Sequence, residues 1–133
     1  MEQLDVACII DDDKIFTYLL SKQMQLINFS KTTLIFPNGL EALKYLKPIL
    51  ESPESLPSVI LLDLNMPVLD GWQFLDQFVL LKPKKKITVY IVSSSIDAAD
   101  HERAKKYEAI SQFYIKPVTQ AHLTEMLMHL KSA

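Results

Sequence analysis

Five polar side chains in this sequence are of the types that can bind or accept a phosphoryl group, and each lies at the end of an apolar run. They are Asp11, Asp12, Asp63, Ser93 and Lys116. Three carboxylates brought close together repel one another and raise one another's pKa unless a cation neutralises them. Oxygen ligands of this kind suit Mg²⁺. With a hydroxyl and an ammonium group added, the set fits phosphoryl transfer onto a carboxylate oxygen.

The apolar runs that carry these residues read as β-strands. The run at residues 59–62 is continuously apolar, which is typical of a short strand buried on both faces of a parallel sheet. The run at 87–92 is β-branched and aromatic, and the one at 110–115 is a weaker example. The five predicted strands are residues 6–10, 32–36, 59–62, 87–92 and 110–115.

Between and after the strands, apolar residues recur at helical spacing. Asp13, Asn38 and Thr119 are placed to cap the first, second and last helices. Pro48 predicts that the second helix kinks or ends near Lys47. The first two helices have apolar residues at helical spacing: Phe16, Leu19, Leu20, Met24 and Ile27, then Leu40, Leu43, Leu46 and Leu50. In a helix at 72–81, the residues Phe74, Leu75, Phe78 and Leu81 should turn inward. The buried stripe of the last helix should be Leu123, Met126, Leu127 and Leu130. A more polar helix is predicted at 97–108.

Strands that alternate with helices predict an α/β fold: a doubly wound, five-stranded parallel sheet with right-handed crossovers. We expect the flavodoxin-like strand order 2-1-3-4-5. In such sheets ligand chemistry collects at the carboxyl ends of the strands, next to the switch point between the first and third strands. Asp11, Asp12 and Asp63 should therefore meet in one small pocket, with Ser93 and Lys116 on the same edge.

At this point the sequence closely resembles the receiver domain of two-component response regulators, over essentially the whole chain. Each matching piece is weak alone, but five pieces in order, each at a strand end, make a strong signal. The matching pieces are Asp11-Asp12, Asp63, the run from Met66-Pro67 to Asp70-Gly71, Ser93, and Lys116-Pro117.

The resemblance implies roles around a magnesium ion. Asp63 would be the phosphoacceptor, taking its phosphoryl group from the phosphohistidine of a partner. Asp12, Asp63 and the backbone carbonyl of Asn65 would bind Mg²⁺ directly, and Asp11 would act mainly through a water molecule. The domain would accept and lose its own phosphoryl group without being a turnover enzyme.

The resemblance also implies a switch. Lys116 would pair with Asp63 and then with its phosphate, and the peptide bond from Lys116 to Pro117 would be cis. Ser93 would bind a phosphate oxygen and draw its loop inward. Phe113 occupies the place of the switch aromatic and would turn inward in response, although an aromatic residue in this strand could equally be ordinary core packing.

The sequence departs from the receiver pattern at a few positions. Ser93 replaces the commoner threonine and keeps the hydroxyl, whereas Phe113 replaces the frequent tyrosine and loses one. The usual Gly-Ala before the last strand is replaced by residues 109–111, so that turn should be shaped differently. Asn65 and Ser95 lie where receivers tune the lifetime of the phosphoaspartate.

Composition narrows the class of protein. The chain has 133 residues, enough for one domain, and 49% of them are apolar. A net charge of −2 gives no general attraction for nucleic acid or anionic membrane. A single cysteine, Cys8, fits a reducing compartment, and the acidic start lacks a signal peptide, so we expect a cytoplasmic protein. No apolar run approaches the length of a membrane span.

Taken together, these features predict a single receiver domain at residues 1–133 with no output domain. A sensor histidine kinase or a histidine phosphotransfer protein would be its donor. Its output would be a contact with a downstream protein, through the face formed by the fourth helix, the fifth strand and the last helix. Candidate surface residues on that face are Ile96, Lys105, Tyr107, Tyr114 and Met128.

Three other interpretations were weighed against this one. A phosphorylation-independent binding module on the same fold is the main alternative. An aspartate-nucleophile phosphohydrolase needs a second acid two residues after the nucleophile, where this chain has Asn65. A flavin-binding relative needs a loop rich in serine, threonine and glycine where this chain is acidic.

Several residues are expected to be structural. Cys8 should be buried in the core, and Trp72 should anchor the start of the third helix. The histidines His101, His122 and His129 and the lysine-rich run at 82–86 are expected to be solvated.

Overall fold

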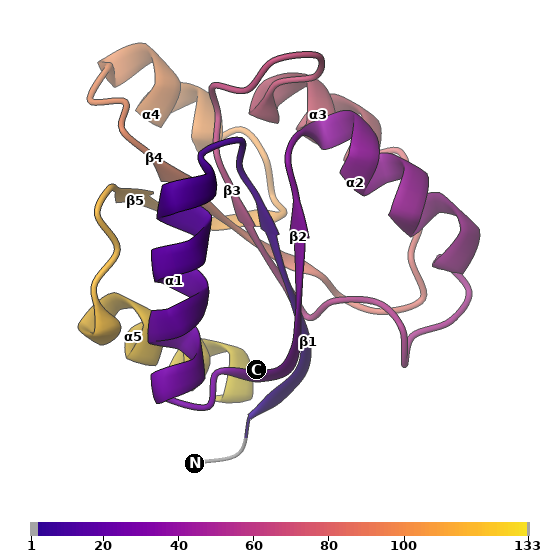
Figure 1. Cartoon of the computed structure of the whole chain (residues 1–133). Helices are drawn as coiled ribbons and strands as arrows, with labels where there is room; N and C mark the ends of the chain where they lie inside the picture. The colour runs from indigo at the N-terminus through magenta and orange to yellow at the C-terminus, as the bar shows by residue number, and fades with distance from the viewer. Residues whose placement is uncertain (1–2, 133) are drawn as a thin grey trace.

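The computed structural model describes residues 3–132. Five strands and five α-helices alternate along the chain (Figure 1). The strands are β1 (Leu4–Ile10), β2 (Ser30–Phe36), β3 (Val59–Leu62), β4 (Thr88–Ser93) and β5 (Ile110–Ile115). The α-helices are α1 (Lys14–Leu26), α2 (Gly39–Leu46), α3 (Gly71–Phe78), α4 (Ala98–Ala104) and α5 (Gln120–Ser132). A short 3₁₀ turn, η1 (Lys47–Ile49), follows α2 directly.

All neighbouring strands are parallel, and the sheet order is β2-β1-β3-β4-β5, which confirms the predicted fold. The register aligns the strand ends: Ile10 of β1 lies opposite Leu62 of β3, and Leu62 lies opposite Ile91 of β4. Because the strands run the same way, the residue that follows each one emerges at the same edge of the sheet. This register is what positions the site.

Helices cover both faces of the sheet (Figure 1). On one face, Ala7 and Ile9 of β1 pack in a cluster with α1 and α5, whose buried side chains include Leu20 and Leu123. On the other face, alternate residues of the same strands pack against α2, α3 and α4. Cys8 belongs to this second cluster and is fully buried, as predicted. Within the described residues no helix is long and apolar enough to cross a lipid bilayer.

The predicted helix starts are confirmed by their capping bonds. The side chains of Asp13 and Asn38 accept from the backbone N–H groups of Phe16 and Glu41, at 2.9 and 3.0 Å. Thr119 Oγ1 accepts from the N–H of His122 at 3.1 Å. The second helix ends at Leu46, and Pro48 lies in the 3₁₀ turn that follows, which confirms the predicted end near Lys47.

Two of the apolar residues at helical spacing do not face the core. Leu19 of α1 is 56% exposed and Leu40 of α2 is 37% exposed. The residue next to each is buried instead: Leu20 in α1 and Gly39 in α2.

Two helices are shorter than predicted. α3 ends at Phe78 rather than at residue 81, because its last turn tightens into bonds from Leu80 N–H to the Gln77 carbonyl and from Leu81 N–H to the Phe78 carbonyl. Pro83 follows closely and disfavours helix just before it. α4 ends at Ala104 rather than at residue 108, through the same kind of tightened turn.

Candidate functional site

Four strand ends bring the predicted site residues to one edge of the sheet. Asp11 follows β1 and is 4% exposed, while Asp63 follows β3 and is 6% exposed. Asp12, next to Asp11, is exposed. Carboxylate oxygens of the three aspartates lie within 4.8 Å of one another. The acid cluster, by which we mean Asp11, Asp12 and Asp63, therefore forms as the sequence predicted.

Backbone N–H groups hold the two buried carboxylates in place. Asp63 Oδ1 accepts from the N–H of Leu64 at 2.9 Å, and Asp11 Oδ1 accepts from the N–H of Asp13 at 2.9 Å. Asp13 itself turns away to cap α1. The three consecutive acids after β1 thus divide into two that enter the cluster and one that caps a helix.

Lys116 reaches the acid cluster from the end of β5. Its Nζ lies 2.9 Å from Asp11 Oδ2 and 3.9 Å from Asp63 Oδ1, so its shorter contact is with Asp11 rather than with the predicted partner Asp63. The ammonium also lies 4.2 Å from the centroid of the Phe16 ring on α1. The peptide bond between Lys116 and Pro117 is cis.

The electrostatics of the cluster favour a bound cation. Burial, reinforced by the charge of Asp11, raises the pKa of Asp63 from 3.8 to about 6, although Lys116 opposes the shift. Burial also raises the pKa of Asp11, against the hydrogen bond from Asp13 and the nearby Lys116. One ammonium does not neutralise three carboxylates. A set of oxygen donors at this spacing fits Mg²⁺, which takes carboxylates and keeps several waters.

The loop between β3 and α3 is shaped to keep Asp63 in position. Gly71 begins α3 against the strand end, and its N–H donates to the Leu64 carbonyl at 2.9 Å. A Cβ at Gly71 would lie 2.4 Å from the backbone oxygen of Asp63, so only glycine fits there. Asp70 caps the helix in a reciprocal capping box with Gln73.

The same loop contains a residue in the left-handed region. Val68 has φ 70°, and the Leu69 N–H donates to the Pro67 carbonyl at 2.8 Å, which makes a tight γ-turn. A β-branched residue in this conformation is strained. Nothing in the sequence pattern predicted this turn. Asn65, near the start of the loop, is exposed.

Ser93 ends β4 fully buried, at the edge shared with the acid cluster. Its Oγ accepts from the N–H of Ser95 at 3.2 Å. Ser95 Oγ donates in turn to Asp100 Oδ2 at 2.7 Å, and Trp72 Nε1 on α3 donates to Asp100 Oδ1 at 3.3 Å. Hydrogen bonds thus join the buried hydroxyl to α4 and α3. Sequence reasoning missed Asp100, because a single acid on a polar helix carries no distinguishing signal.

Phe113 lies half-buried on β5 and stacks on the ring of His101, with the two centroids 3.8 Å apart. His101 Nε2 lies 3.2 Å from the Ser95 carbonyl oxygen. The expectation that His101 would be solvated was therefore wrong: its ring fills the space beside Phe113. His122 is likewise half-buried, in contact with the cap of α5 and the ring of Tyr114, whereas His129 is exposed.

One residue predicted for the surface of the α4-β5-α5 face is buried. Tyr114 is 5% exposed, because alternate residues of β5 face opposite sides and this one faces α5. Its hydroxyl donates to Glu125 at 2.7 Å. The other candidates reach solvent to different extents: Ile96, Lys105 and Met128 are exposed and Tyr107 is half-buried. Trp72 is buried at the start of α3, as predicted.

Comparison with known proteins agrees with the site. The family profile of the response regulator receiver domain matches residues 7–128. The chain is 25% identical over 126 residues to the probable methanogenesis regulatory protein FilR2 of Methanothrix harundinacea, covering 95% of this chain and 81% of FilR2. It is 31% identical over 116 residues to the transcriptional regulatory protein PrrA of Mycobacterium leprae, covering 86% of this chain but only 45% of PrrA.

Solved structures give the same result. The crystal structure of a two-component response regulator from Cytophaga hutchinsonii superposes with a TM-score of 0.89 and 26% identity, covering 99% of this chain and 100% of that one. The chemotaxis protein CheY4 of Vibrio cholerae shares the fold with a TM-score of 0.78 at 18% identity, covering 96% of this chain and 98% of that one. The fold, the matched residues and the acid cluster together place this chain in the response regulator receiver domain family.

Proposed function

We propose that this receiver accepts a phosphoryl group on Asp63 and signals by binding another protein in its phosphorylated form. The observation that supports this most directly is the convergence of Asp63, Asp11, Asp12 and Lys116 at one edge of the sheet. Membership of the receiver family implies a histidine kinase or a histidine phosphotransfer protein as the donor. In the transfer, an Asp63 oxygen would form a bond to phosphorus as the phosphorus–nitrogen bond of the donor breaks.

The chain's own residues would divide the work. Asp12, Asp63 and the Asn65 backbone carbonyl would hold Mg²⁺, with Asp11 acting through a water molecule. The ion, when bound, would supply positive charge that offsets the carboxylates and the incoming phosphate. Lys116 stands close enough to both buried aspartates to neutralise charge that develops beside Asp63.

Ser93 and Phe113 would carry the signal outward. Ser93 would donate its hydroxyl to the phosphate, and Phe113 would leave His101 and turn inward, which shifts an existing two-state equilibrium. The proposed target surface is the α4-β5-α5 face, where Ile96 and Met128 are exposed. This is a phosphoacceptor in the cytoplasm rather than a turnover enzyme.

The test is labelling by a small phosphodonor. Wild type, incubated with acetyl phosphate and Mg²⁺, should gain one phosphoryl group that hydroxylamine removes, and EDTA should prevent the gain. Asp63→Asn should not be labelled. Asp13→Asn is the matched control, because it makes the same change at a neighbouring acid that caps α1 instead, and it should label like wild type.

The same assay distinguishes the proposed function from its main alternative. A binding module that works without phosphorylation would show no labelling and no response to beryllofluoride in wild type. Equal labelling of wild type and Asp63→Asn would remove Asp63 from its proposed role.

A further inference from the structure

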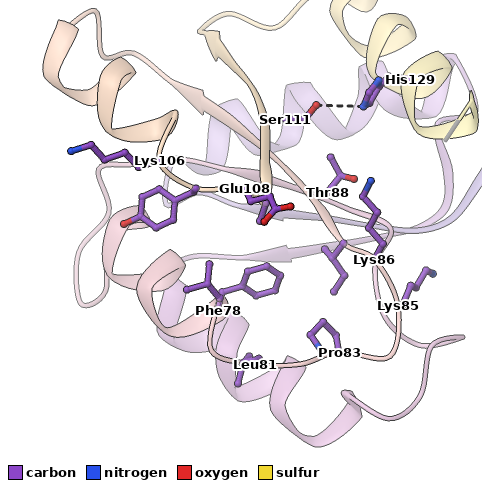
Figure 2. A pocket seen from close by; sticks show the side chains of 14 residues that line it. Phe78, Leu81, Pro83, Lys85, Lys86, Thr88, Lys106, Glu108, Ser111 and His129 are labelled. Atoms are coloured by element: carbon purple, nitrogen blue, oxygen red, sulfur yellow. Dashed lines mark hydrogen bonds between the residues drawn. The ribbon is translucent and has the colours of Figure 1, made fainter.

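One hollow in the described part of the chain lies away from the acid cluster. It opens at the opposite edge of the sheet, where β4 and β5 begin, and has a volume of about 740 Å³ (Figure 2). None of the predicted phosphorylation residues lines it. Its volume falls within the range of sites that bind ligands or partner side chains.

The early ends of two helices create this hollow. α3 stops at Phe78 and α4 stops at Ala104, so neither extends over the start of β4 and β5. Phe78, Ile87 and Ala109 are apolar residues that line the hollow, and we call them its floor. Figure 2 shows Leu81 to one side of Phe78. Phe78 and Ile87 are only 5% and 7% exposed, so a partner side chain would meet them at the bottom of the hollow rather than on an open patch.

Basic side chains stand around the apolar floor. Lys86 and Lys106 lie on opposite sides of the hollow and are exposed (Figure 2). Neither ammonium group forms an ion pair within residues 3–132. Lys85 is already engaged by the Leu56 carbonyl oxygen at 3.0 Å. Glu108 is the one carboxylate among the residues that line the hollow.

This local excess of positive charge stands out on a chain whose net charge is −2. The acid cluster lies at the other edge of the sheet, away from this group of lysines. An incoming group that is itself acidic is attracted to the hollow and repelled by the acid cluster.

We propose that the hollow binds an acidic segment of a partner protein, which inserts one apolar side chain onto the Phe78–Ile87–Ala109 floor. Carboxylates on either side of that anchor pair with Lys86 and Lys106. The spacing of the two lysines across the floor is what favours acidic residues on both sides of the anchor. The site borders the α4-β5-α5 face, with which it shares Tyr107, but it does not depend on phosphorylation of Asp63.

Trp72 provides a built-in reporter for occupancy. It is the single tryptophan of the chain, and its ring stacks on Tyr107, with centroids 5.7 Å apart. Tyr107 lines the hollow. The probe is a blocked synthetic peptide with a central phenylalanine flanked by glutamates. It should change Trp72 emission in a saturable way, and shift the amide resonances of Ile87, Thr88 and Ala109 in the NMR spectrum.

Three comparisons test the chemistry of recognition. A peptide with serine in place of phenylalanine, and one with lysines in place of glutamates, should not bind. The double variant Lys86→Gln/Lys106→Gln should bind the acidic peptide about fivefold more weakly, as expected for two exposed ion pairs of roughly 0.5 kcal/mol each. The matched control Lys22→Gln/Lys47→Gln, at exposed lysines elsewhere, should bind like wild type. Added salt should weaken binding by wild type more than by the double variant.

Several outcomes would overturn the proposal. These are the absence of resonance shifts at the hollow, shifts confined to another surface, or equal binding by wild type and the double variant. Preferential binding of a short DNA duplex or of anionic lipid vesicles over the acidic peptide would mean that the lysines serve a different class of partner. Since the peptide is added to unphosphorylated protein, failure here is independent of the labelling result at Asp63.

Discussion

Asp63→Asn should make the cation-free protein more stable, although it removes the proposed phosphoacceptor. Burial and the charge of Asp11 raise the pKa of Asp63 from 3.8 to about 6 in the folded state. An increase of this size in the pKa means that the ionised carboxylate destabilises the fold by about 3 kcal/mol at neutral pH. Asparagine removes that charge, and its oxygen can still accept from the Leu64 N–H. Because Lys116 also loses one carboxylate neighbour, we expect a net gain of about 2 kcal/mol.

The pH dependence follows from the direction of the shift. Below the pKa of the unfolded state, near 3.8, Asp63 is protonated in both the folded and the unfolded protein and does not reduce stability. As pH rises through about 6, the folded state must give up its proton, and wild type loses the corresponding stability. The advantage of Asp63→Asn should therefore be largest above pH 7 and should vanish towards pH 4.

Urea unfolding in EDTA, followed by far-ultraviolet circular dichroism across this pH range, measures the difference. Mg²⁺ should stabilise wild type by ligand linkage and stabilise the variant much less. Asp13→Asn is the control and should be about as stable as wild type at pH 7.5, because its side chain is exposed and asparagine caps helices equally well. A variant that is less stable than wild type in EDTA at pH 7.5, or an advantage that does not shrink in acid, would refute the reasoning.

Three further predictions follow from the loop and the core. Gly71→Ala should destabilise the fold by about 3 kcal/mol, since the added Cβ would press on the Asp63 backbone. The variant should also be labelled less by acetyl phosphate. A variant as stable as wild type in urea would contradict the close approach of Gly71 to Asp63. Val68→Gly should leave stability unchanged or raise it by up to about 1 kcal/mol, because removing the strain of valine in the left-handed region outweighs the extra unfolded-state entropy of glycine. A clear loss of stability in the same urea assay would argue against the γ-turn. Cys8 is fully buried and burial raises the pKa of its thiol, so a chromogenic thiol reagent should react only as the protein unfolds; rapid reaction of the native protein would show that the β1 core opens readily.

Much of the fold was predictable because its signals are local and repeated. Continuous apolar runs marked strands buried on both faces, and Asp13, Asn38 and Thr119 marked helix starts by a bond each side chain makes within one turn. The convergence of Asp11, Asp12 and Asp63 followed from strand order alone, since parallel strands end at the same edge. The family resemblance then supplied their roles, which stay predictions.

What could not be predicted depends on contacts between elements that are distant in sequence. The shorter contact of Lys116 is with Asp11, which depends on angles that no spacing encodes. Tyr114 is buried because α5 packs on that side of β5, and His101 is half-buried because Phe113 offers its ring. α4 ends early where the chain turns, and Tyr107 just beyond it contacts Trp72 and Asp76 on α3.

The thin attachment of α4 has a dynamic consequence. Its seven residues bury only Ala104, and it is held instead by the Trp72–Asp100 hydrogen bond, the Tyr107–Asp76 hydrogen bond and the His101–Phe113 stack. Elements with little buried apolar surface open first, so the amides of α4 should exchange with deuterium well before those of α1 and α5. Under the proposed function, phosphorylation would have to displace only this lightly held helix, which is linked to Ser93 through Ser95 and Asp100, to change the outer surface of the domain.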